Sequence, residues 1–269
     1  MKADLHIHTT VSDGLTGPVE ALRLAASLGI DVVAITDHDT DAALPLLGEA
    51  GALPVAVLPG VEMDTRLDGL PLEILVYGHR VGAEPLAGML AGAAGRRSRR
   101  AEILWTALRR ALGAELPPLS ALLPPPRRVI TRPQMVDCLL EARVLPHRQG
   151  AREAVAFYDP GFDPPSTEEA FRAAKASGGL CVLAHPLQVG GADPKALIER
   201  LAGMGLDGVE TAYPYAAPAD QARAAEVAAW AGRLGLIGTG GSDAHRAEEI
   251  GRVTVELPEA LRARLLGGR

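Results

Sequence analysis

Seven short apolar runs, most of them followed at once by polar or ionisable residues, divide this chain. They lie near residues 4, 32, 56, 74, 181, 209 and 237. Each run has the length of a buried strand, and most of the segments between them have the length of a helix. Strands that alternate with helices form parallel sheets, because a parallel connection needs a crossover. The sequence therefore predicts an α/β fold with polar side chains at the carboxyl ends of its strands.

The alternation stops between residues 84 and 165. This segment holds an arginine-rich stretch of predicted helix, a proline-rich stretch, and a second helix that begins at Thr131-Arg132-Pro133. None of it has the pattern of a strand. We therefore expect two parts: residues 1–83 with 166–269 form the α/β unit, and residues 84–165 form a helical insertion that covers the site.

Composition narrows the class of partner. The net charge of −6 argues against a general nucleic-acid-binding protein. Cys138 and Cys181 are the only cysteines and lie far apart in apolar surroundings, so we expect no disulfide and a reducing compartment. We also expect no secretion leader and no membrane span, because the sequence shows neither pattern. The prediction is a cytoplasmic protein without a stable nucleic-acid partner.

His6 and His8 stand two residues apart in the first apolar run, so both imidazoles are expected on one face of a strand. Asp4 shares this face by the same count, and we predict that it accepts a hydrogen bond from a ligating imidazole. A single histidine after a strand is usually an ordinary polar residue. Five of the chain's seven histidines at such positions favour a metal site instead.

Imidazole nitrogens and carboxylate oxygens suit zinc, manganese and iron(II), and the lack of thiolates argues against a structural zinc site. Nine side chains are candidate ligands: His6, His8, Asp13, His38, Glu62, Glu73, His185, Asp243 and His245. This set exceeds what one ion needs, so we predict two or three ions and a bridging carboxylate, for which Glu62 is best placed. Ions a few ångströms apart activate water and stabilise both oxygens of an in-line displacement, which is the chemistry of phosphoester hydrolysis.

Several segments together resemble the polymerase-and-histidinol-phosphatase (PHP) family of metal-dependent phosphoesterases. They are Asp4-Leu5-His6-Ile7-His8-Thr9, Ser12-Asp13-Gly14, Ile35-Thr36-Asp37-His38-Asp39, Gly60-Val61-Glu62, Ala184-His185-Pro186, Gly208-Val209-Glu210 and Gly241-Ser242-Asp243-Ala244-His245. The resemblance covers nearly the whole chain. It implies a distorted seven-stranded (β/α) barrel with three metal ions at its C-terminal mouth.

The resemblance also distributes the ligands among the ions. It implies one ion held by His6, His8, Glu62 and Asp243. Glu62 would bridge to a second ion, held also by His185 and a ligand from the fourth strand. Asp13, His38 and His245 would hold the third ion.

Within the family the chain most resembles the branch that removes the 3′-phosphate of nucleoside 3′,5′-bisphosphates, some members of which also trim short RNA from the 5′ end. The arginines of the insertion point to this branch. The resemblance implies that Arg97, Arg100 and Arg132 bind substrate phosphates, because a guanidinium can meet two phosphate oxygens at once. His38 is expected to contact substrate as well. Asp13 or His245 is expected to assist proton transfer to the leaving oxygen.

The chain departs from the family pattern at two places. The fourth-strand ligand is usually a histidine within the strand, where this chain has Glu73; His79, six residues later, is the alternative. The segment Phe157–Pro165 replaces a Gly-x-Gly-x-Pro-Ala-Tyr-like segment of the relatives. The second departure bears on the substrate rather than on the metal chemistry.

Three functions follow from these observations. The leading prediction is a metal-dependent phosphomonoesterase for a nucleotide such as adenosine 3′,5′-bisphosphate, with short oligoribonucleotides as further substrates. The second is a phosphatase for histidinol phosphate or another small phosphomonoester, which would use the same metal centre. The third is a non-catalytic metal-binding accessory domain, because PHP modules also occur attached to polymerases.

Overall fold

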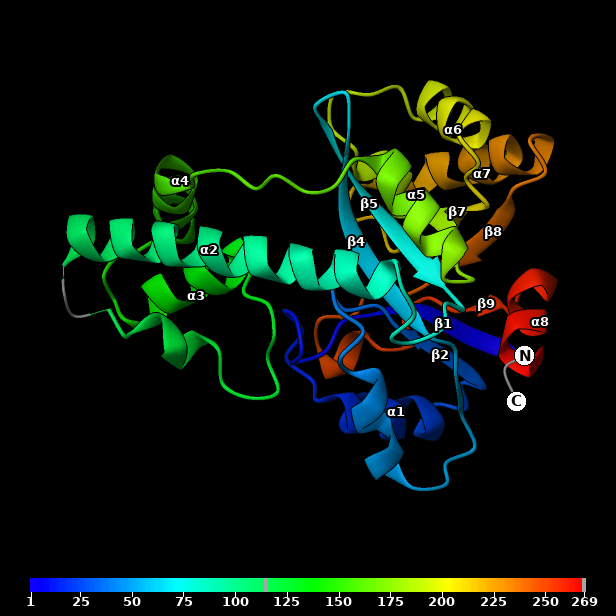
Figure 1. The fold of residues 1–269 in the computed structure, drawn as a ribbon, viewed down its shortest axis with the longest axis horizontal. Helices are drawn as coiled ribbons and strands as arrows, with labels where there is room; N and C mark the ends of the chain where they lie inside the picture. Colours follow the sequence, from blue (N-terminus) through cyan, green and yellow to red (C-terminus); the bar gives the residue numbers. More distant parts are fainter. Residues whose placement is uncertain (114–115, 268–269) are drawn as a thin grey trace.

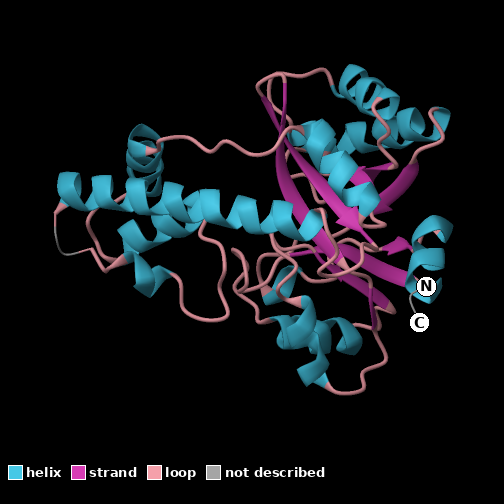
Figure 2. Ribbon diagram, in the orientation of Figure 1, coloured by secondary structure: helices cyan, strands magenta, loops and turns pink. Residues whose placement is uncertain are grey.

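The computed structural model describes residues 1–113 and 116–267, whose nine strands form two sheets (Figures 1 and 2). The first sheet has the order β3-β2-β1-β9, with β1 (Lys2–Ile7), β2 (Val32–Ile35), β3 (Ala56–Val57) and β9 (Val255–Glu256). The second has the order β4-β5-β6-β7-β8, with β4 (Gly60–Leu67), β5 (Leu70–Tyr77), β6 (Leu180–Leu183), β7 (Gly208–Ala212) and β8 (Ile237–Gly240). The predicted α/β class is confirmed.

The two sheets meet through two isolated bridges rather than through a continuous ladder. One bridge joins Ile7 to Ala244, and the other joins His38 to Glu62. An apolar cluster fills the space between the sheets and includes Leu5, Leu75 and Val182. The strands described here therefore surround a common interior, without the closed seven-stranded ladder that the sequence predicted.

Strand direction also differs in part from the prediction. β1, β2 and β3 are parallel, as are β6, β7 and β8. β4 and β5 instead form an antiparallel hairpin, β6 pairs antiparallel with β5, and β9 pairs antiparallel with β1. The hairpin turns at Asp68 and Gly69, which both have positive φ, as a type I′ turn requires. Asp-Gly is a strong signal for such a hairpin, and it accounts for β4, a strand that carries Glu62 and was not among the seven predicted runs.

Helices cover the outer faces of the sheets. α1 (Pro18–Ser27) packs on the first sheet, and α5 (Thr167–Ala176), α6 (Pro194–Gly203) and α7 (Pro218–Arg233) pack on the second. α8 (Glu259–Gly267) lies beside β1 and β9, and Leu261 joins the interior cluster. Short 3₁₀ helices η1 (Leu44–Ala50), η3 (Pro186–Gln188) and η4 (Ala247–Glu249) lie in the connections.

The helical segment after β5 extends away from the sheets (Figure 1). It comprises α2 (Leu86–Leu112), η2 (Leu119–Leu122), α3 (Arg132–Glu141) and α4 (Arg148–Tyr158), and its described residues contain no strand. These helices share an apolar cluster of their own, which includes Trp105, Leu108 and Leu139.

Both cysteines are free, and no helix among the described residues is long and apolar enough to cross a membrane.

Substitution of Gly241, which follows β8, would test how closely the two sheets approach each other. A Cβ at Gly241 would overlap the backbone nitrogen of His6, whereas a Cβ at Gly95 on α2 would meet open space. We expect Gly241→Ala to destabilise the fold by at least about 2 kcal/mol through overpacking. Gly95→Ala should stabilise it by about 1 kcal/mol, because alanine favours a helix interior. Urea unfolding of both variants measures this, and an unchanged midpoint for Gly241→Ala would contradict the close approach.

Candidate metal centre

The ends of strands from both sheets bring the predicted ligands together. His6 belongs to β1 and His8 follows it, His38 follows β2, and Glu62 belongs to β4. Glu73 belongs to β5, His185 follows β6, and Asp243 and His245 follow β8. Buried apolar neighbours on each strand fix the backbone, so these polar side chains are held at one end of the interior.

Glu62 lies at the middle of the cluster and is almost fully buried. Its Oε1 is 3.3 Å from Nε2 of His6 and 3.2 Å from Nε2 of His185. Its Oε2 is 3.2 Å from Nε2 of His8 and 3.2 Å from Nδ1 of His38. One carboxylate thus faces four imidazoles, two with each oxygen.

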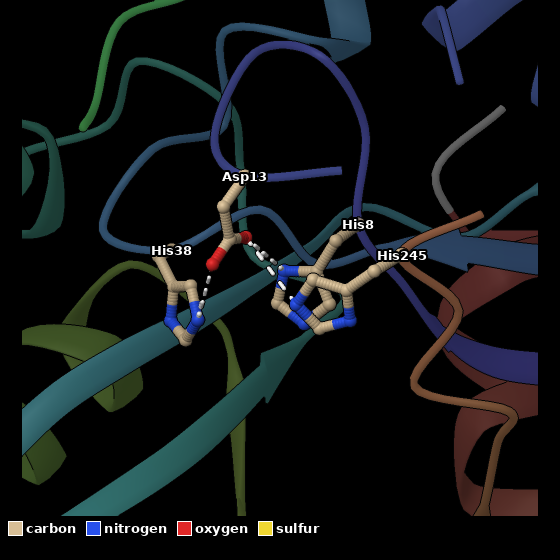
Figure 3. Close-up of side chains that lie close together, drawn as sticks. All are labelled: His8, Asp13, His38 and His245. Carbon is tan, nitrogen blue, oxygen red and sulfur yellow. Dashed lines mark ion pairs between the residues drawn. The ribbon is translucent and has the colours of Figure 1, made fainter. Parts of the chain in front are cut away.

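Two further carboxylates extend the cluster on either side of His8. Asp243 Oδ1 lies 3.1 Å from His8 Nε2 and 3.3 Å from His6 Nε2. Asp13 Oδ1 lies 3.6 Å from His8 Nδ1 and 3.4 Å from His245 Nε2, and its Oδ2 lies 3.7 Å from His38 Nε2. Figure 3 shows Asp13 between His38 on one side and His8 with His245 on the other.

The structure brings Glu73, rather than His79, to the fourth-strand position. Glu73 Oε2 is 3.3 Å from His185 Nε2. His79 is buried elsewhere, with its Nε2 at 3.2 Å from Asp41 Oδ2. His79 therefore contacts none of the residues grouped above.

The arrangement fits divalent ions. The ligand atoms fall into four groups, each within 4.8 Å: His8, Asp13, His38 and His245; His6, His185 and Asp243; His6, His8 and Glu62; and His38, Glu62 and Glu73. Atoms that bind one ion at about 2.1 Å in a tetrahedron lie about 3.4 Å apart. The separations of 3.2–3.3 Å between the Glu62 oxygens and the four imidazole nitrogens are close to this spacing. Nδ1 of His8 is buried without a hydrogen-bond partner among the described residues, and Nδ1 of His38 forms no hydrogen bond of acceptable geometry despite lying 3.2 Å from Glu62 Oε2. Both are costly unless a cation binds these nitrogens.

A hydrogen bond that His6 donates to Glu210 orients the His6 imidazole. Glu210 Oε1 is 3.1 Å from His6 Nδ1, and Glu210 Oε2 accepts a hydrogen bond from the His185 backbone nitrogen. With its proton on Nδ1, neutral His6 directs the lone pair of Nε2 at the carboxylates and at His8 Nε2, 3.1 Å away. Lone pairs would repel in this arrangement, and a proton or a metal ion among them removes the repulsion.

The prediction that Asp4 would orient an imidazole is wrong. Its carboxylate accepts hydrogen bonds from Ser242 and from the Gly251 backbone nitrogen. The pairing of β1 with β2 shifts register between Asp4 and Ile7, so the count of two that places Asp4 beside His6 does not hold. Glu210 takes this role from a strand that lies far away in the sequence.

Electrostatics in the cluster favour bound cations or protons. Burial opposes protonation of His6 and His8, but the neighbouring carboxylates outweigh it and raise the pKa of both imidazoles well above the usual value. The imidazoles of His6, His38 and His185 outweigh burial at Glu62 and lower the pKa of its carboxyl. Burial and the charge of Glu62 raise the pKa of Glu73 to about 7. Metal ions would therefore compete with protons for this site.

The three predicted phosphate-binding arginines lie in two different environments. Arg97 is buried, with Nε 2.5 Å from Asp39 Oδ2 and a terminal nitrogen 2.6 Å from Asp64 Oδ2. Arg100 and Arg132 line a cavity of about 430 Å³ together with Asp159. Glu73 and His185 line the same cavity, so it reaches the metal cluster.

An α/β fold with this cluster of imidazoles and carboxylates defines a metal-dependent hydrolase. Comparison with known proteins supports this class. The family model described as "PHP-associated" matches residues 224–267. A solved structure from Bifidobacterium adolescentis, described as a metal-dependent phosphoesterase, superposes with a TM-score of 0.78 at 29% identity over 90% of this chain and 87% of its own.

Three enzymes are similar along most of the sequence. A phosphoribosyl 1,2-cyclic phosphate 1,2-diphosphodiesterase of Eggerthella lenta is 34% identical, over 94% of this chain and 97% of its own. A 5′-3′ exoribonuclease of Escherichia coli is 28% identical, over 90% and 85%. A 3′,5′-nucleoside bisphosphate phosphatase of Chromobacterium violaceum is 29% identical, over 93% and 89%. The chain belongs to the PHP family of metal-dependent phosphoesterases and is a hydrolase.

The central carboxylate provides a direct test of metal binding. Glu62→Gln keeps the size of the side chain but removes the charge that faces four imidazoles. We expect the variant to hold at least one metal ion fewer per chain than the wild type by elemental analysis. The rise in melting temperature that added Mn²⁺ gives the metal-stripped wild type should also shrink, because ligands stabilise only the state that binds them. Glu168→Gln, at an exposed position on α5, is the matched control; equal metal content in both variants would contradict the assignment.

Proposed function

We propose that this PHP phosphoesterase removes a phosphate from a small nucleotide, with a nucleoside 3′,5′-bisphosphate such as adenosine 3′,5′-bisphosphate as the leading substrate. The cavity between the metal cluster and the insertion carries this proposal. Glu73 and His185 line it on one side, and Arg100 and Arg132 line it as well. A substrate with two phosphates can thus place one at the metal cluster and the other at the guanidiniums.

We further propose that the nine residues named from the sequence hold up to three divalent ions, Mn²⁺, Zn²⁺ or Fe²⁺. Such ions supply positive charge for the phosphoryl oxygens and lower the pKa of a water. The position of Glu62 between His6 and His185 on one side, and His8 and His38 on the other, supports its role as the bridging ligand. His38 is also proposed to contact substrate, since it is less buried than His6 and His8.

Asp13 and His245 receive a second proposed role, proton transfer to the leaving oxygen. His245 is the most exposed imidazole of the cluster, with 36% of its side chain accessible. Its Nδ1 lies 2.9 Å from the Asp243 carbonyl oxygen, and its Nε2 faces Asp13. These contacts leave Nε2 as the nitrogen that either binds an ion or exchanges a proton with the substrate, so His245 fills only one of its two proposed roles at a time.

Residues 84–165 are proposed to be the cap of the active site. Two contacts near the cluster support this. Arg97 of α2 joins Asp39 and Asp64, and the Gln134 side chain of α3 donates a hydrogen bond to the Ser12 carbonyl oxygen, beside Asp13. Because two carboxylates already surround Arg97, we propose that it holds α2 against the centre and that Arg100 and Arg132 bind phosphate.

Two other substrate classes are supported by the relatives. A cyclic phosphoribosyl phosphodiester is the substrate class in the name of the Eggerthella lenta enzyme, and RNA is the substrate class in the name of the Escherichia coli exoribonuclease. Histidinol phosphate is a weaker candidate, because it has one phosphate and leaves Arg100 and Arg132 without one. The accessory-domain alternative is not retained, since the relatives that match this chain over most of its length are enzymes.

Product release by the purified, Mn²⁺-loaded protein tests the proposal. Inorganic phosphate is measured with adenosine 3′,5′-bisphosphate and with histidinol phosphate, and chromatography follows the cleavage of phosphoribosyl 1,2-cyclic phosphate and of a 5′-phosphorylated trinucleotide. We expect the largest kcat/KM for the bisphosphate, and a loss of more than about 100-fold in His8→Ala, because that imidazole faces both Glu62 and Asp243. A larger kcat/KM for another member would reassign the substrate. Release no faster than that of His8→Ala for every member would overturn the proposed activity.

A further inference from the structure

Asp159 lies against both guanidiniums of the cavity beside the metal cluster. Its Oδ1 accepts a hydrogen bond from Nε of Arg100 at 2.7 Å, and its Oδ2 accepts one from a terminal nitrogen of the same guanidinium. Arg132 Nη1 lies 3.9 Å from Oδ2. The carboxylate is largely buried, and it lines the cavity together with the two arginines.

The segment that carries Asp159 is fixed at several points. The Gly161 backbone nitrogen donates to Asp159 Oδ1 at 3.0 Å. The Phe162 ring lies under Arg97 and Arg100, with guanidinium carbons 4.8 and 5.6 Å from the ring centre. Arg66 of β4 donates to the Phe162 carbonyl oxygen at 2.7 Å. Asp159 is thus presented to the arginines by a segment that is held between α2 and β4.

The paired contact to Arg100 is the geometry by which a guanidinium also binds phosphate. A carboxylate in this position therefore occupies the donors that a phosphate would use. Partial burial raises the pKa of Asp159, but hydrogen bonds from Arg100 and from Gly161 outweigh it and lower the pKa, so the group is charged at neutral pH. The three side chains carry a net charge of about +1 rather than +2.

We infer that Asp159 is a specificity-determining residue, whose carboxylate competes with the second phosphate of a substrate for Arg100 and Arg132. The inference rests on the proposed function, because it assumes that the substrate lies in this cavity. A dianionic phosphate displaces the carboxylate from Arg100, whereas a hydroxyl at the same position does not. Asp159 therefore weakens the binding of bisphosphates and leaves the binding of monophosphates unchanged.

A substrate pair isolates this effect. Adenosine 3′,5′-bisphosphate and adenosine 3′-monophosphate share the phosphate that is removed and differ only in the remote one. In Asp159→Asn the amide oxygen still accepts the hydrogen bond from Gly161 but carries no charge. We expect KM for the bisphosphate to fall at least about fivefold and KM for the monophosphate to stay within about twofold, because only the former meets the freed guanidinium. Asp163→Asn, at an exposed position of the same segment, is the matched control and should change neither KM.

A second variant distinguishes competition from a structural role. In an Arg100→Gln, Arg132→Gln background neither guanidinium remains to be released, so adding Asp159→Asn should leave both KM values unchanged. If Asp159→Asn alters the two KM values equally in the wild-type background, or alters neither, the inference is overturned. The inference is also overturned if the effect on the bisphosphate persists in the background without the two arginines.

The same experiment separates the inference from the proposed function. If the wild-type enzyme turns over neither nucleotide, the proposed function fails. Both nucleotides can then be titrated calorimetrically into the Mn²⁺-loaded wild type and Asp159→Asn, because nothing is consumed. Tighter binding of the bisphosphate alone by Asp159→Asn supports the competition, and equal affinities in the two proteins overturn it.

Discussion

The contact of one buried carboxylate with four imidazoles is the constraint on which the rest of this structure depends. Glu62 reaches His6, His8, His38 and His185 at 3.2–3.3 Å, and these side chains come from strands of both sheets. Bringing so many ionisable groups out of water is costly unless their charges are balanced. Protons or metal ions provide that balance, and the orphaned imidazole nitrogens favour metal. The candidate metal centre and the junction between the sheets are therefore the same part of the molecule.

Much of the site was predictable because its residues follow local rules. His6 and His8 share a face by simple alternation, and His38, His185, Asp243 and His245 follow apolar runs whose carboxyl ends meet. Glu210 and Asp4 were not predictable in this way. A register shift in β1 turns Asp4 from the cluster, and the partner of His6 comes from a strand 204 residues later. Pairing across such a distance depends on tertiary packing, which local periodicity does not encode.

The fold, like the site, combines features that local sequence predicts with features that depend on distant pairing. The apolar runs and their helices were predicted, but neither β4, with its Asp68-Gly69 turn, nor the short strand β9 was among the predicted strands. β4 alternates buried residues with charged ones at its outer end, so its apolar content is low for a strand. This hairpin matters for function, because it carries Glu62, Asp64 and Glu73. The insertion then adds Arg100, Arg132 and Asp159 across the cavity. Under the proposed function, the strands thus supply the metal ligands and the insertion selects the substrate.

The most direct test of the central claim is anomalous diffraction from crystals of the Mn²⁺-loaded protein, measured on both sides of the manganese absorption edge. The account predicts anomalous peaks on both sides of the Glu62 carboxylate, each within about 2.3 Å of one of its oxygens and of imidazole nitrogens from His6, His8, His38 or His185. Full manganese occupancy at other positions, with no peak beside Glu62, would contradict it.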